Sequence, residues 1–123
     1  MGAYEPKFLY GDVVTATASA TVTVVQGIGT TLAVTGNGTV GPAGADSNAI
    51  VGTAAVDAAN GERFPYHPRG KVHISTAAGG ITAGDRVNSA AAGAVKTAAA
   101  GLGNIGIALT TAADTAAVEW MEI

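Results

Sequence analysis

The chain has 123 residues, enough for one folded unit that buries a hydrophobic core without disulfides or structural metals. It contains no cysteine, which excludes disulfides and thiolate sites, and its net charge of −3 with 12% charged residues argues against a nucleic-acid partner. No stretch approaches the roughly 20 apolar residues that span a bilayer, so we expect no membrane segment.

The composition favours β-structure over helix. Hydrophobic residues make up 48% of the chain, but much of this is alanine interleaved with threonine, valine and glycine, without an apolar stripe of helical period. Threonine and valine suit the pleated surface of a sheet. Since alanine buries little area, such a core gains little free energy per residue. We therefore expect association with copies of the same chain or with a larger surface.

The first ten residues concentrate the aromatic side chains. Tyr4, Phe8 and Tyr10 share one parity, so on an extended chain they face the same way. Pro6 lacks an N–H donor and disfavours helix around it. The segment is either a first strand on its own core or an arm that lies on a partner. We predict an extended N-terminal arm over residues 1–10 and a single β-rich domain over residues 11–123.

The segment that follows predicts short strands separated by glycine turns. Residues 21–24 alternate threonine and valine, the period-two pattern of a half-buried strand. Gly27-Ile28-Gly29 interrupts this pattern, and Gly36-Asn37-Gly38 is a strong hairpin signal. Residues 41–48 form the clearest loop. A strand over 49–54 follows, and then a connection with room for one helical turn.

The stretch from Glu62 to Ile74 holds the main cluster of basic and aromatic side chains. Its two prolines predict a sheet edge or a bend rather than a central strand. Val72 and Ile74 then share one face of a new strand, opposite Lys71 and His73. The alternative to an interaction surface is a solvated edge guarded by proline. The residues predicted to contact a partner here are Arg63, Tyr66 and Arg69.

The second half is organised around a glycine-aspartate turn. Gly84 can adopt positive φ at no steric cost, and Asp85 is expected to hydrogen-bond the backbone two residues on. The neighbouring strands are expected to bury Ile81, Val87 and Val95. Two more strands are predicted over residues 104–109 and 117–123. Several short strands joined by turns are typical of a small sandwich or barrel. We predict an all-β fold, a compact β-sandwich or barrel of short strands with at most one or two short helical turns.

Nothing in the sequence points to catalysis, a cofactor or a metal. His67 and His73 lie six residues apart, roughly 20 Å in an extended strand, and cannot share a metal unless the chain folds back at Gly70. The serines lack a Gly-x-Ser-x-Gly elbow, and most acidic residues sit beside Gly, Ala or Asn in expected turns. We predict a protein that is not an enzyme, with no catalytic, cofactor-binding or metal-binding residues.

Four short motifs follow one another in the second half: Arg-Gly-Lys-Val at 69–72, Ile-Thr-Ala-Gly-Asp-Arg-Val at 81–87, Gly-Ala-Val at 93–95 and Ile-Gly-Ile-Ala at 105–108. In this order and spacing they resemble the capsid decoration (cement) proteins of tailed bacteriophages, a family formerly known as a domain of unknown function. The resemblance covers roughly residues 50–123. Lys71 departs from it, because the family has glycine and valine adjacent at that place.

The resemblance implies a structural virion protein that binds the outside of the mature icosahedral phage head and stabilises contacts of the major capsid protein. It implies a homo-trimer at local three-fold positions, made in the host bacterial cytoplasm, without direct contact to nucleic acid or membrane. Beside the candidates in the second half, the expected capsid contacts are Tyr4, Pro6, Phe8 and Tyr10. The alternative is a β-rich adhesin, or another virion module of the tail or head fibre, that binds a host glycan.

Overall fold

The computed structural model describes residues 13–25, 27–99 and 104–123. The predicted arm over residues 1–10 lies outside the described residues. Within them the chain is all-β, with a single short 3-10 turn, η1 (Ala91–Gly93), as its only helical element. The strands are β1 (Val14–Ala18), β2 (Val24–Val25), β3 (Ile28–Gly29), β4 (Thr31–Gly36), β5 (Thr39–Pro42), β6 (Ile50–Ala54), β7 (Arg63–Pro68), β8 (Val72–Thr76), β9 (Arg86–Ser89), β10 (Val95–Thr97), β11 (Gly106–Ala108) and β12 (Ala117–Glu122).

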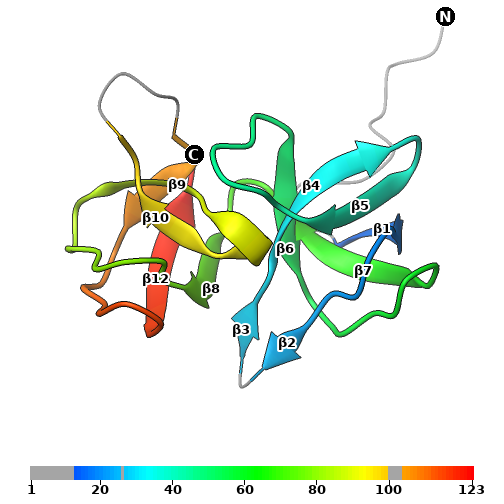
Figure 1. The fold of residues 1–123 in the computed structure, drawn as a ribbon, viewed down its shortest axis with the longest axis horizontal. Coiled ribbons are helices and arrows are strands. Elements are labelled where there is room, and N and C mark those ends of the chain that lie inside the picture. Colours follow the sequence, from blue (N-terminus) through cyan, green and yellow to red (C-terminus); the bar gives the residue numbers. More distant parts are fainter. Residues whose placement is uncertain (1–12, 26, 100–103) are drawn as a thin grey trace, which may run out of the picture.

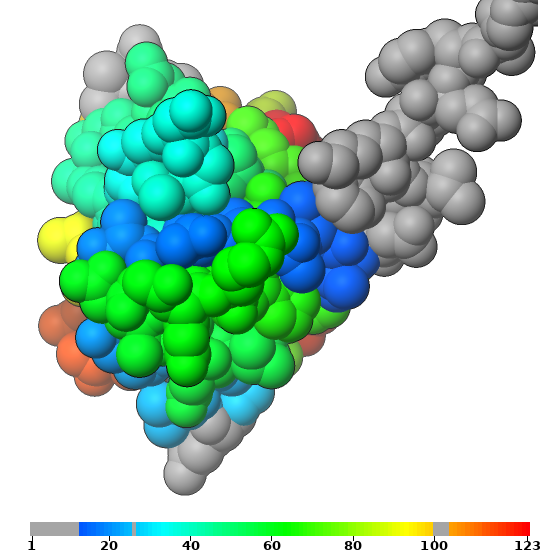
Figure 2. Space-filling view, turned by 90° about the vertical axis from the view of Figure 1, so that its right-hand side faces the viewer, coloured from blue at the N-terminus to red at the C-terminus, as the bar shows by residue number. Residues whose placement is uncertain are grey.

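The first half of the chain closes into a barrel. Its strand order is β1-β5-β4-β6-β7, and β7 pairs back with β1 (Figure 1). Figure 2 shows this side of the molecule, where β1 in blue lies against β7 in green. The pairing of β1 with β5 is parallel and the other pairs are antiparallel. The predicted hairpin turn at Gly36-Asn37-Gly38 is confirmed, because it connects β4 to β5 and Gly38 has φ +74°.

The second half forms an antiparallel sheet of five strands in the order β10-β9-β11-β12-β8, on the left in Figure 1. A separate hairpin of β2 and β3 lies close to β8. The predicted inward residues are confirmed: Ile81, Val87 and Val95 are all buried. Gly84 has the expected positive φ. The Asp85 carboxylate, however, accepts from the Thr82 N–H at 2.9 Å, so it closes its turn toward the N-terminal side rather than two residues on.

Two hydrophobic clusters fill the interior. One lies in the barrel around Leu32, Val22 and Phe64. The other lies under the five-stranded sheet around Trp120 and Val118, and it includes Ala33, Ala43 and Ile50 from the barrel half. The two halves of the chain therefore share one of their clusters. The division into an arm over residues 1–10 and a single β-rich domain over residues 11–123 stays a prediction.

The prolines of β7 correct one expectation. The sequence predicted a sheet edge or a bend there, but β7 is paired on both sides within the barrel. Pro65 is in register only with Thr15 of β1, and Pro68 only with Gly52 of β6. The two ladders overlap at Tyr66 alone. Each proline therefore lies where a single neighbouring strand is paired, so that the missing N–H donor is tolerated.

The connection over residues 55–61 forms no helical turn. Ala58 instead makes an isolated bridge to Val22, with backbone hydrogen bonds of 2.8 and 3.0 Å in the two directions. This bridge buries Val22 against the barrel. A strand-like contact thus takes the place of the helical turn for which the composition left room.

Candidate functional site

A buried polar network lies beneath the edge of the five-stranded sheet. The side chains of His73 and Glu122 are buried, with His73 Nε2 at 2.9 Å from Glu122 Oε2. Arg69 Nε approaches Glu122 Oε1 at 3.4 Å, and the Arg69 guanidinium also donates to the carbonyl oxygen of Ile123. A buried carboxylate is tolerated only when it is paired in this way. The network therefore ties the turn after β7 to the end of β12.

Trp120 belongs to the same network. Its Nε1 donates to the Ser75 hydroxyl at 2.9 Å, and its ring lies 5.2 Å from the His73 ring, centroid to centroid. All these groups face the interior. The sequence analysis missed the pair of His73 and Glu122, although a signal was present: on a strand over 117–123, Glu122 shares a face with Val118 and Trp120.

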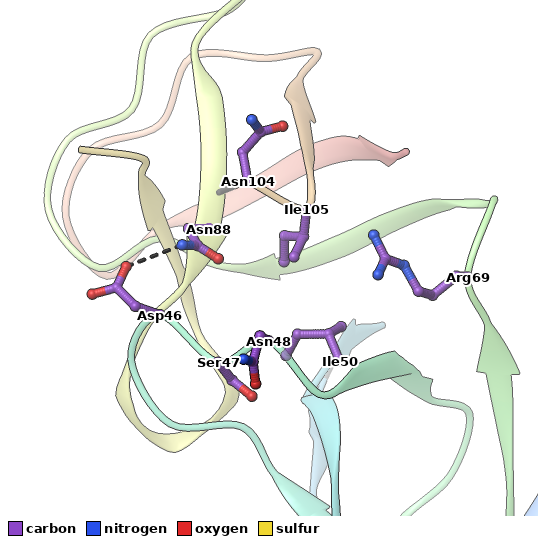
Figure 3. A pocket seen from close by; sticks show the side chains of 8 residues that line it. All are labelled: Asp46, Ser47, Asn48, Ile50, Arg69, Asn88, Asn104 and Ile105. Carbon is purple, nitrogen blue, oxygen red and sulfur yellow. Dashed lines mark hydrogen bonds between the residues drawn. The ribbon is translucent and has the colours of Figure 1, made fainter. Parts of the chain in front are cut away.

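A polar pocket of about 280 Å³ lies between the two halves of the molecule (Figure 3). Asp46 anchors one end of it, accepting from Asn88 Nδ2 and Lys96 Nζ, both at 3.0 Å. Arg69 lies at the other end. The pocket lining consists of Asp46, Ser47, Asn48, Ile50, Arg69, Asn88, Asn104 and Ile105. Since Asp46 and Arg69 already have partners within the chain, the arrangement holds the loop between β5 and β6, residues 43–49, in place.

The basic cluster predicted on β7 divides in the structure. Arg63 is exposed at the start of the strand and donates to Thr15 Oγ1 at 3.2 Å. Arg69 lies just beyond the other end, roughly 20 Å away at the usual rise per residue. Tyr66 was predicted to contact a partner, but in the structure its side chain is buried. It packs in the barrel cluster near Phe64, at 6.4 Å between ring centroids, because alternate residues of β7 face the interior.

Two pKa values depart from the ordinary range in this region. Burial raises the pKa of the Tyr66 hydroxyl. Burial also lowers the pKa of His67 below its ordinary value of 6.5, and the positive charge of Lys71 and the nearby His73 lower it further. Lys71 Nζ lies 3.2 Å from His67 Nδ1, so the neutral ring is the form that accepts this hydrogen bond.

The described residues contain no group of three histidine, aspartate or glutamate side chains arranged to hold a metal ion. His67 and His73 come near enough to interact because the chain reverses at Gly70, which has φ +94°. Nor do the described residues form a helix long and apolar enough to cross a membrane.

The family model described as phage cement protein matches residues 8–123. The chain belongs to the phage cement protein family. It is therefore a structural virion protein that binds the phage capsid, and the resemblance seen in the order of the sequence motifs is confirmed. The match includes Phe8 and Tyr10 of the predicted arm, whereas Tyr4 and Pro6 precede it.

The fold of this cement protein is also found in a solved structure described as the head fibre gp8.5 N base of bacteriophage phi29. The two share 18% sequence identity with a TM-score of 0.69, over 91% of this chain and 93% of that chain. At this identity the likeness establishes the shared fold alone. No curated protein sequence matches this cement protein.

Protonation of His67 is expected to make the stability of the cement protein depend on pH. The unfolded chain takes up a proton as the pH falls through 6.5, whereas the folded chain, with its lowered pKa, does so only at lower pH. The free energy of unfolding should therefore decrease as the pH falls below 6.5 and level off below the folded pKa. Urea unfolding of wild type and His67→Gln between pH 8 and pH 4.5 measures this. The wild type should lose more stability than the variant, and parallel curves would contradict the expectation.

Proposed function

We propose that this cement protein binds the outer surface of the mature icosahedral head as a homo-trimer at local three-fold positions, and that it stabilises contacts between subunits of the major capsid protein. The observation that carries the proposal is the family match over residues 8–123. A protein that binds only the assembled shell stabilises it by mass action, and many copies on one lattice multiply a modest free energy per site. This role needs no catalytic group, and we infer that the protein is not an enzyme. We further propose that it is made in the cytoplasm of the host bacterium.

Within this proposal, the capsid contacts are the predicted arm together with Arg63 and Arg69. The arm supplies Tyr4, Pro6, Phe8 and Tyr10, and aromatic side chains dominate the energetics of many protein interfaces. Arg63 is exposed and its partner is an uncharged hydroxyl, so its charge is open to a carboxylate on a neighbouring subunit. Arg69 is already held by Glu122, so a second acceptor there would compete with the internal pair. Tyr66 is not included, because it lies in the barrel core.

Deleting residues 1–10 is expected to weaken binding to undecorated heads by at least about tenfold, the effect of losing one or two aromatic anchors. The measurement is co-sedimentation of purified protein with heads over a range of protein concentrations. The matched control replaces Tyr4, Phe8 and Tyr10 by serine and keeps the length. If both variants bind as wild type does, the arm is not a capsid contact.

A head-fibre base is the second candidate, favoured by the fold shared with the phi29 head fibre N base. In that case the protein would anchor a projecting fibre on the capsid, and the glycan-binding function would reside in the fibre. Electron microscopy of decorated heads separates the two functions. Low knobs at three-fold positions support the cement role, whereas extended projections support the fibre role.

A further inference from the structure

The outer face of the five-stranded sheet carries large apolar side chains. On β8 the polar residues His73 and Ser75 are buried, whereas Val72 and Ile74 are 52% and 42% exposed. On β12, Met121 is 40% exposed. An antiparallel sheet with one solvated face normally directs its apolar side chains inward and its polar side chains outward. An outer face built from large apolar residues indicates that something covers it.

These apolar residues form a continuous area because the strand register places them side by side. Met121 is directly paired with Val72 on one side and with Ile107 on the other. Directly paired side chains lie about 4.5–5.5 Å apart at Cβ. Leu109 follows β11 on the same face and is 44% exposed. We call this surface the outer patch, formed by Val72, Ile74, Ile107, Leu109 and Met121.

The outer patch carries one positive and one negative charge. Arg86 is paired with Ile107 at one side of the patch, and Glu119 is paired with Ile74 within it. Among the residues of β8, β9, β11 and β12 that face outward, these are the only two charged side chains. Neither forms an ion pair with another described residue, since the nearest polar partner of Arg86 is Asn104 Oδ1 at 3.4 Å. Two strand spacings, about 10 Å, separate them across the sheet.

A surface with an apolar centre, one unpaired cation and one unpaired anion is complementary to another copy of itself. We propose that the outer patch is the contact between copies of this chain, with the patches gathered around a three-fold axis so that Arg86 of each copy faces Glu119 of the next. The proposal rests on the homo-trimer of the proposed function and assigns its interface. The contact is heterologous, because the Arg86 side of one patch meets the Glu119 side of the next, and three such contacts close a ring. Charge complementarity fixes the register, while the apolar centre supplies the affinity.

The test is the mass of the purified full chain in solution by light scattering, over a wide range of protein concentrations. Wild type is expected to be a trimer. Met121→Asp, at the centre of the patch, should raise the concentration at which the trimer dissociates by at least about tenfold. The matched control is Val34→Asp, which places the same charge at a 49% exposed valine of the barrel and should leave the mass unchanged. Circular dichroism checks that both variants are folded.

The charged pair gives a second, sharper test. Arg86→Glu and Glu119→Arg should each weaken the trimer, because each places like charges opposite one another across the contact. The double variant carrying both changes restores opposite charges and should recover the wild-type mass. A monomeric wild type, or a trimer that Met121→Asp leaves intact, overturns the assignment. So does a double variant weaker than either single variant.

Head binding is measured separately by co-sedimentation. A trimer that behaves as described but does not bind heads leaves this inference standing and defeats the proposed function. A monomeric wild type that loses head binding on Met121→Asp assigns the outer patch to the capsid subunit, and that result overturns the inference.

Discussion

Replacing Trp120 with alanine is expected to lower the free energy of unfolding by about 3–5 kcal/mol, the usual cost of deleting a fully buried large aromatic side chain. Trp120 is fully buried in the cluster under the five-stranded sheet. Its removal leaves a cavity, takes the hydrogen-bond donor from Ser75 and removes the ring that lies against His73. Urea unfolding followed by circular dichroism, at one fixed protein concentration because association is linked to stability, measures the loss.

Trp120→Phe serves as the matched variant. It retains much of the apolar volume but loses the indole N–H, so it should cost clearly less than Trp120→Ala. Val34→Ala provides the control for an exposed position and should stay within about 0.5 kcal/mol of wild type. An alanine variant at position 120 that loses less than 1 kcal/mol would show that the cluster is not packed as described.

Replacing Gly52 with alanine is expected to cost at least about 3 kcal/mol, at the upper end of overpacking effects. A Cβ atom at Gly52 would lie 1.9 Å from the carbonyl oxygen of His67, which belongs to the backbone of β7. Backbone yields less than a flexible side chain. His67 belongs to the ladder between β6 and β7, in register with Thr53, so moving its carbonyl group away from Gly52 disturbs that pairing.

Gly44→Ala is the matched control, because no atom lies within 4 Å of the Cβ that it would add. The same urea titration compares the two variants. Gly44→Ala should unfold with wild type, while Gly52→Ala should unfold at much lower urea concentration or fail to accumulate as soluble protein. Equal stability of the two variants would contradict the close approach of β6 and β7.

The sequence predicted the protein family, but it predicted the individual contact residues less well. The motif order from residue 69 to residue 108 indicated the cement family, and the family match confirms it. The individual contact residues were harder to predict from the sequence, because the exposure of a side chain depends on which face of its strand turns inward. Tyr66 lies near Arg63 and Arg69 in the sequence and was predicted to contact a partner. The closed barrel instead directs its side chain into the core.

The sequence by itself determined the fold class, the turns and the family. The Asn-Gly and Gly-Asp turns and the inward Ile81, Val87 and Val95 are local signals, and each is set by backbone preference or by period-two patterning. The alternation over residues 21–24, read as one strand, gives only an isolated bridge at Val22 and the start of β2. Only the tertiary structure decided that β7 closes a barrel and that β8 buries His73 while it exposes Val72 and Ile74. The physical reason is that Glu122, 49 residues further along the chain, pairs with His73. A hydrogen bond between residues this far apart in the sequence is a long-range contact, and the periodicity of β8 alone does not identify the partner.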